Sequence, residues 1–167
     1  MILPYLTWTT LVFAAALILV EVADSTGDDL TVRPISHYFG TATSVVQDAM
    51  FLAMAAALWY TAWTLGMTWL SASLAAVGLG LALAMSTDTW PRLYFGADRV
   101  LHYTGAALCF LAGLSMMLAV SDYTYALAYA SGALLLVLID RKQTAVQEKL
   151  GVLMLIVWVF GYSLNLA

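Results

Sequence analysis

The side chains that could do chemistry in this sequence are its two histidines, His37 and His102, and a few acidic residues set among apolar ones. If a helix begins near His37, Ser44 and Asp48 follow at i+7 and i+11 and share its face. Asp98 and His102 share a face at i and i+4, so the carboxylate could orient the imidazole. The candidate polar site comprises His37, Ser44, Asp48, Asp88, Asp98, His102 and Glu21.

These residue types are compatible with three kinds of site. His37 and His102 on facing helices could be the axial ligands of a haem. The same histidines with nearby carboxylates could hold zinc, leaving one coordination position for the water that attacks a lipid or amide bond. Asp48, placed within an apolar helix, could relay protons or bind a solute in a small transporter, because acids at such depth mark functional sites.

A structural role for the same residues is the alternative. The sequence contains no His-Glu-x-x-His motif, no His-x-x-x-His pair and no nucleophile elbow. Histidines at helix starts often meet backbone donors or lipid phosphates, and the carboxyl group of Asp48 could bond to its Ser, Thr or Gln neighbours. No catalytic residue is therefore assigned.

A strongly apolar chain must position these groups. Of 167 residues, 63% are apolar and 10% are charged, against about 25% charged residues in ordinary soluble domains. One soluble core of this size could not bury so much apolar surface, so lipid is the expected solvent. The net charge of −4 argues against a nucleic-acid partner. The single cysteine, Cys109, excludes an internal disulfide framework and is expected to be a small packing residue.

The apolar residues fall into stretches that suit membrane helices, which need roughly 20 residues each. The stretches are residues 3–20, 41–63, 69–85, 100–120, 123–139 and 150–166. They predict an all-α polytopic membrane protein, a bundle of six transmembrane helices in three hairpins, forming a single domain over residues 1–167. Abundant Gly and Ala, including Gly78, Gly80, Gly105 and Gly113, should let helix backbones approach closely.

Charge and aromatic residues predict an orientation. All basic residues fall in the first, third and fifth loops, as Arg33, Arg92, Arg99, Arg141, Lys142 and Lys149. The positive-inside rule places these loops in the cytoplasm of a prokaryotic inner or plasma membrane, with both termini outside. A belt of aromatic residues should mark the outer boundary: Tyr5, Trp8, Trp59, Tyr60, Trp63, Trp69, Tyr123, Tyr125, Trp158 and Tyr162.

Two short segments of the sequence are similar to each other, and the similarity has two interpretations. His37-Tyr38-Phe39-Gly40 is followed later by His102-Tyr103-Thr104-Gly105, each at the start of an even-numbered predicted helix. A genuine repeat would imply a pseudo-two-fold axis along the membrane normal, as in parallel-repeat transporters. Coincidence in a sequence rich in Tyr, Gly and Ala explains the match equally well.

Several short motifs resemble a family of six-helix membrane proteins catalogued as domain of unknown function 998. The matching segments are Ile35-Ser36-His37-Tyr38-Phe39-Gly40, Thr87-Asp88-Thr89, Leu101-His102, Gly105-Ala106-Ala107 and Gln147-Glu148-Lys149. The resemblance implies a six-helix bundle and no particular activity. The family often has a further histidine shortly before the one matching His102, where this sequence has Asp98 and Arg99. In the family the basic loops are often the second and fourth, opposite to the orientation that the charges here indicate.

The sequence as a whole favours a non-catalytic function. We expect an accessory subunit of a membrane complex, or a binder of a lipid or small ligand. Its partners would be the lipid bilayer and other membrane subunits or a second copy in a homo-oligomer. The alternatives are a metal-dependent membrane hydrolase or haem- or zinc-binding protein using His37 and His102, and a small transporter.

Overall fold

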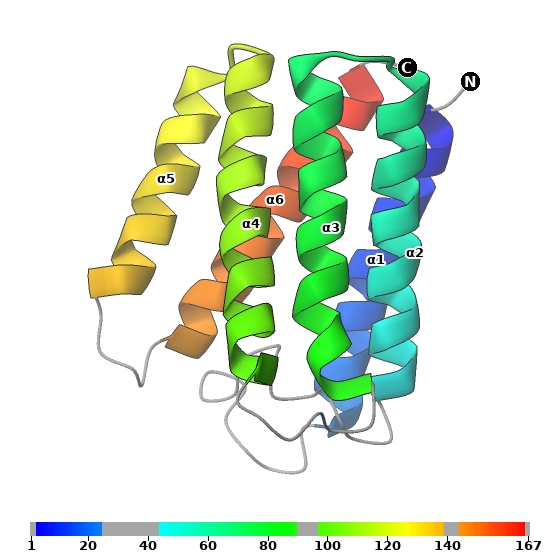
Figure 1. Ribbon diagram of the computed structural model, residues 1–167, viewed down its shortest axis with the longest axis vertical. Coiled ribbons are helices and arrows are strands. Elements are labelled where there is room, and N and C mark those ends of the chain that lie inside the picture. The colour runs from blue at the N-terminus through cyan, green and yellow to red at the C-terminus, as the bar shows by residue number, and fades with distance from the viewer. Residues whose placement is uncertain (1–2, 25–43, 90–96, 139–143, 166–167) are drawn as a thin grey trace.

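The protein is built from α-helices throughout the part of the chain that the structure describes. The computed structural model (Figure 1) describes residues 3–24, 44–89, 97–138 and 144–165. Within these ranges it places the side chains of residues 5–19, 49–84, 100–132, 134 and 149–164. The helices are α1 (Leu3–Asp24), α2 (Ser44–Thr64), α3 (Trp69–Thr89), α4 (Ala97–Ala119), α5 (Tyr123–Leu138) and α6 (Thr144–Asn165). The prediction of six helices in an all-α protein is confirmed for these residues.

Some helices extend beyond the apolar stretches in which they were expected. α1 continues to Asp24 rather than ending near residue 20, and α6 begins at Thr144 rather than near residue 150. Both extensions carry charged residues, including Glu21 and Lys149. Hydropathy marks only the apolar part of a helix, whereas its backbone hydrogen bonds continue through polar residues at the ends.

Successive helices run antiparallel and each packs against its neighbours in the chain. Contact between α1 and α6 closes this order into a ring, so the three predicted hairpins are parts of one up-and-down bundle. In Figure 1, α5, α4, α3 and α2 form one layer, and α6 and α1 lie behind it. The "turn end" holds the start of α1, the α2–α3 and α4–α5 turns and the end of α6. The "opposite end" holds the remaining helix ends.

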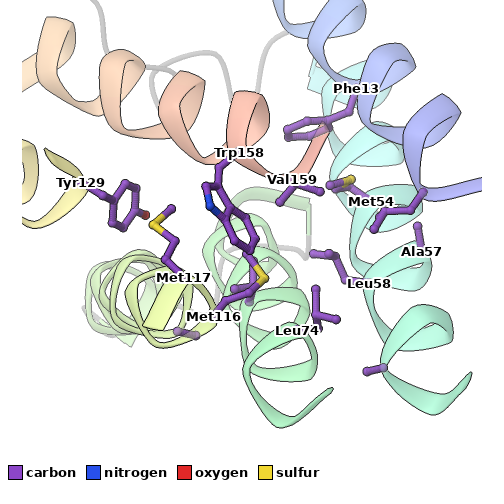
Figure 2. Close-up of a cluster of buried hydrophobic side chains, with 14 of the residues drawn as sticks. Phe13, Met54, Ala57, Leu58, Leu74, Met116, Met117, Tyr129, Trp158 and Val159 are labelled. Atoms are coloured by element: carbon purple, nitrogen blue, oxygen red, sulfur yellow. The ribbon is translucent and has the colours of Figure 1, made fainter. Parts of the chain in front are cut away.

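Large apolar side chains from around the ring fill the centre of the bundle (Figure 2). Leu58 of α2 and Met116 and Met117 of α4 are fully buried there. Phe13 of α1 meets Phe51 of α2 edge to face, with ring centroids 5.0 Å apart. This interdigitation fixes how the helices face each other, because a close-packed interior tolerates few changes in side-chain volume.

The backbones of α3 and α4 come into direct contact along an interface that we name the α3–α4 seam, lined by Gly80, Ala84, Gly105 and Cys109. A Cβ atom added at Gly105 would lie 2.6 Å from the carbonyl oxygen of Gly80 and against the amide nitrogen of Ala84. One added at Gly80 would lie 2.6 Å from Sγ of Cys109. The predicted close approach of helices at small residues is confirmed here.

One stretch of the described chain, Val100–Ala119 in α4, is long and apolar enough to cross a membrane by length and composition. Shorter apolar helical stretches are Tyr5–Leu19, Ala49–Thr64, Trp69–Ala84 and Lys149–Leu164.

Candidate functional site

The polar residues singled out in the sequence lie at the opposite end of the bundle, as far as the structure describes them. Their positions are Glu21 near the end of α1, Ser44 and Asp48 at the start of α2, Asp88 near the end of α3, and Asp98 and His102 at the start of α4. The antiparallel order of the helices thus gathers these backbone positions at one end. Only His102 among them has a described side chain, and His37 lies outside the described residues, so the predicted site remains a prediction.

His102 is held against the neighbouring helix by its ring. Its Nδ1 atom lies 3.0 Å from the carbonyl oxygen of Ala84 in α3. A carbonyl oxygen only accepts, so Nδ1 carries the hydrogen, and in the neutral ring the lone pair is then on Nε2. The imidazole is half-buried and meets the ring of Tyr103 edge to face, with centroids 5.7 Å apart. A hydrogen bond from one ring nitrogen to a carbonyl oxygen is how proteins fix the tautomer of a histidine ligand.

The α3–α4 seam explains why the ring of His102 can reach this carbonyl. Gly105 lies three residues after His102, on the same face of α4, and packs on the backbone at Ala84. The short distance between the two helices brings the imidazole within hydrogen-bond range. Spacing within α4 suggested the carboxylate of Asp98 as the group that orients the ring, and could not identify an acceptor on another helix.

Further hydrogen bonds join α3 to α4 along the same interface. The hydroxyl groups of Ser73 and Ser115 lie 2.9 Å apart, near the turn end. The thiol of Cys109, which is free and buried, donates to the carbonyl oxygen of Val77 at 3.5 Å. The thiol therefore belongs to the packing between α3 and α4, as the sequence suggested.

Asp122, which was not among the predicted site residues, joins three helices at the turn end. One carboxylate oxygen accepts a hydrogen bond from the backbone N–H of Tyr125 at 3.2 Å, which caps α5. The other accepts from the indole Nε1–H of Trp158 in α6 at 3.0 Å. Its own N–H donates to the carbonyl oxygen of Met117 in the last turn of α4, with Ser121 in the left-handed region at φ 61°. The Ser121-Asp122 pair directly before an apolar helix is a sequence signal that could have revealed the cap. Nothing in the sequence indicated the bond to Trp158.

Trp158, one of the residues of the predicted aromatic belt, is buried within the bundle. Its side chain is only 6% exposed and lies beside Met116, Met117 and Val159 in the centre of the bundle (Figure 2). The ring of Tyr162 stacks on it at a centroid distance of 4.9 Å. The bond to Asp122 removes the need for the indole N–H to face water or a lipid headgroup, which is why Trp158 can be buried.

Other polar side chains also form hydrogen bonds between helices. Thr7 of α1 and Ser163 of α6 share a hydrogen bond of 2.7 Å. The indole of Trp59 in α2 donates to the carbonyl oxygen of Ala75 in α3 at 3.0 Å. Most polar atoms in the described interior are therefore used to join helices or to bond within one helix.

Tyr129 is the exception within the described part of the chain. Its side chain is 2% exposed, and its hydroxyl group has no hydrogen-bond partner. The hydroxyl is accommodated beside Gly113 of α4, where an added Cβ would lie 3.1 Å from it, and Phe110 packs on the ring. An unpaired buried hydroxyl costs about 1–3 kcal/mol.

Of the two histidines predicted as metal ligands, His102 is the one whose side chain the structure describes. Among the residues that the structure describes, no three His, Cys, Asp or Glu side chains are grouped so that they could hold a metal ion. Comparisons with protein-family models, with curated proteins and with solved structures found no match. The resemblance to the six-helix family of unknown function therefore stays a prediction, and function is argued from the residues alone.

Proposed function

We propose that this protein spans a bilayer six times and acts as a non-catalytic accessory subunit of a larger membrane complex. The observation that carries the non-catalytic role is the use of interior polar atoms. Polar groups in the interior form hydrogen bonds between helices, as those of Ser73, Cys109, Asp122 and Trp158 do. This use of polar groups suits a packed structural unit.

The outward surface supports the membrane location. Large aliphatic side chains stand out along the middle of several helices, with Leu111 68%, Leu127 70% and Leu134 59% exposed. In water, each such side chain would lose about 1.5–3 kcal/mol of the stabilisation that burial provides. In lipid these side chains have a matching solvent and need no further cover.

Helix lengths support the number of spans. α1, α2, α3, α4 and α6 contain 22, 21, 21, 23 and 22 residues. At about 1.5 Å per residue each is about 31–35 Å long, which by length is enough to cross a hydrocarbon core of roughly 30 Å with the charged residues of the helix ends among the headgroups. α5, with 16 residues, is about 24 Å long, and a local thinning of the bilayer would accommodate it.

The positions of the basic residues support an orientation. In the sequence, every Lys and Arg falls in the first, third or fifth predicted loop. The two that lie in described helices are Arg99 at the start of α4 and Lys149 in the second turn of α6, both at the opposite end. No Lys or Arg occurs at the turn end. The positive-inside rule then places the opposite end in the cytoplasm, and the turn end and both chain termini outside.

The test of this proposal has two steps. Membranes carrying the protein are first washed with alkaline carbonate, and an integral protein is expected to stay in the pellet. The protein is then extracted in a mild detergent and its native mass measured, with a fixed-ratio assembly with other membrane subunits expected. Turnover of a lipid or amide substrate by the purified protein, abolished by Asp48→Ala, would overturn the non-catalytic role.

A metal-dependent function is the second candidate, favoured by the bond from His102 to Ala84. That bond selects the tautomer with its lone pair on Nε2, the form in which histidine most often binds zinc or haem iron. Elemental analysis of protein purified without chelators tests it, beside His37→Ala and His102→Ala variants. Near-stoichiometric iron or zinc, lost in both variants and kept in Tyr103→Phe, would favour this candidate over the accessory role.

A further inference from the structure

The α2–α3 turn ends in large apolar side chains that nothing in the described structure covers. Trp63 is 84% exposed, Trp69 is 70% exposed and Met67 is fully exposed. The sequence has no charged residue between Asp48 and Asp88, so the turn and the helical turns on either side of it are uncharged. A short connection facing water would ordinarily be polar, since loops carry exposed backbone groups.

Several backbone N–H groups of this turn find acceptors within it. The N–H of Leu65 donates to Thr61 O, that of Gly66 to Trp63 O, and that of Thr68 to Gly66 O, at 3.1, 3.3 and 3.0 Å.

The start of α3 is closed in the same way. The Thr68 N–H bonds to the hydroxyl of Ser71 at 2.9 Å, while the Ser71 N–H bonds to the hydroxyl of Thr68 at 3.0 Å. This reciprocal arrangement is a capping box, with Ser in the position usually held by Glu. The N–H groups of Leu65, Gly66, Thr68 and Ser71 thus have partners within the turn. Each donor satisfied in this way lowers the cost of moving the turn out of water, which favours a place in lipid.

Other aromatic side chains surround this turn on several helices at the same end of the bundle. The exposed ones are Tyr5 and Trp8 on α1, Trp59 and Tyr60 on α2, and Tyr123 on α5. Four of them lie on the adjacent helices α1 and α2, where the rings of Tyr5 and Tyr60 meet edge to face, and Tyr123 lies on α5, which packs on α4 and α6. Aromatic residues at one end of helices in both parts of the ring suit a membrane plane. Indole and phenol rings prefer the boundary between acyl chains and headgroups.

We propose that the α2–α3 turn is immersed in the lipid at this boundary, with Trp63, Met67 and Trp69 buried among acyl chains and headgroups. The inference rests on the proposed membrane location and adds that this turn lies deeper than the α4–α5 turn. The exposed residue of the α4–α5 turn is Ser121, which is small and polar, whereas the carboxylate of Asp122 bonds to Tyr125 and Trp158. An exposed polar residue without large apolar neighbours in the turn suits a position at the aqueous surface. The two turns therefore differ in depth at one end of one molecule.

Thiol labelling compares the two depths directly. Met67→Cys and Ser121→Cys are each introduced into the protein, with the unsubstituted chain, whose Cys109 is buried, as the background. Each variant is reconstituted into vesicles of phosphatidylethanolamine and phosphatidylglycerol, floated on a density gradient, and treated with a charged, membrane-impermeant maleimide. Both turns lie at one end, so any mixture of insertion orientations affects the two variants equally.

Met67→Cys is expected to react about tenfold more slowly than Ser121→Cys in vesicles, because the reactive thiolate is disfavoured in lipid. In sodium dodecyl sulfate the two rates should become similar. Equal rates in vesicles would overturn the inference by placing both turns in water. If Met67→Cys is protected from the maleimide in native membranes but not in the vesicles, the inference is also overturned, because a protein and not lipid would then cover the turn. Failure of the protein to float with vesicles would remove the membrane location itself, which separates that result from the others.

Discussion

Replacing Gly105 by alanine is expected to destabilise the bundle through the α3–α4 seam. The added Cβ would lie 2.6 Å from the carbonyl oxygen of Gly80 and closer still to the amide nitrogen of Ala84. Both are backbone atoms, so no side-chain rotation relieves the clash, and the helices must separate by about 0.7 Å to restore a normal contact. Such a gap forfeits roughly a quarter to a half of the attraction between the facing atoms.

The magnitude follows from the bonds that this separation affects. Overpacking costs about 1–3 kcal/mol, and weakening the bond from His102 Nδ1 to Ala84 O, now 3.0 Å, costs about 0.5–1.5 kcal/mol. The better helix propensity of alanine offsets up to about 1 kcal/mol. The free energy of unfolding of Gly105→Ala should therefore fall by about 2 kcal/mol.

The assay is equilibrium unfolding in mixed dodecyl maltoside and sodium dodecyl sulfate micelles, followed by circular dichroism. Gly161→Ala is the matched control, because it is also in a helix and an added Cβ there meets no atom within 4 Å. It should be neutral or stabilising by up to about 1 kcal/mol. Equal stability of the two variants, within about 0.5 kcal/mol, would refute the backbone contact between α3 and α4.

Four further substitutions, the last two of them paired, test other contacts by the same unfolding assay. Asp122→Ala should lower the free energy of unfolding by about 2–4 kcal/mol, since it removes a helix cap and leaves the indole N–H of Trp158 unpaired. A loss below about 0.5 kcal/mol would contradict the bonds from Asp122 to α5 and α6. Tyr129→Phe should be neutral or stabilising, because the deleted hydroxyl has no partner among the described residues, and a clear loss of stability would reveal one. Gly151→Ala should cost about 1–2 kcal/mol through the ring of Phe110, 2.6 Å from the added Cβ, and Phe110→Leu should restore part of this loss. Simple additivity of the last two changes would count against the contact.

Helix content and chain order were predictable because they depend on local properties of the sequence. Continuous apolar runs indicated each helix, and the glycines of the α3–α4 seam were recognisable as residues that allow close approach. Antiparallel order followed from short connections such as Leu65–Thr68. The helix ends were less accurate, since polar residues such as Glu21 continue a helix beyond its apolar part.

Contacts between distant parts of the chain could not be predicted from spacing. Trp158 was assigned to the membrane boundary because indoles favour it, yet a carboxylate on another helix satisfies its N–H within the bundle. Likewise, the partner of His102 Nδ1 is a backbone carbonyl in α3. In both cases the partner is decided by which helices pack together, and no local pattern encodes that choice.

The same packing determines how well the candidate polar residues are positioned relative to each other. α3 and α4 are held by backbone contact at Gly105 and by the hydrogen bonds that Ser73 shares with Ser115 and that His102 donates to Ala84. α2 is joined to α3 through Trp59. The backbone positions that these three helices contribute to the opposite end are therefore fixed relative to one another. α1, which carries Glu21, shares its described hydrogen bond with α6 at the turn end, through Thr7. A ligand site at the opposite end would accordingly depend on α2, α3 and α4 for its geometry, because binding groups must be held by elements that are themselves fixed.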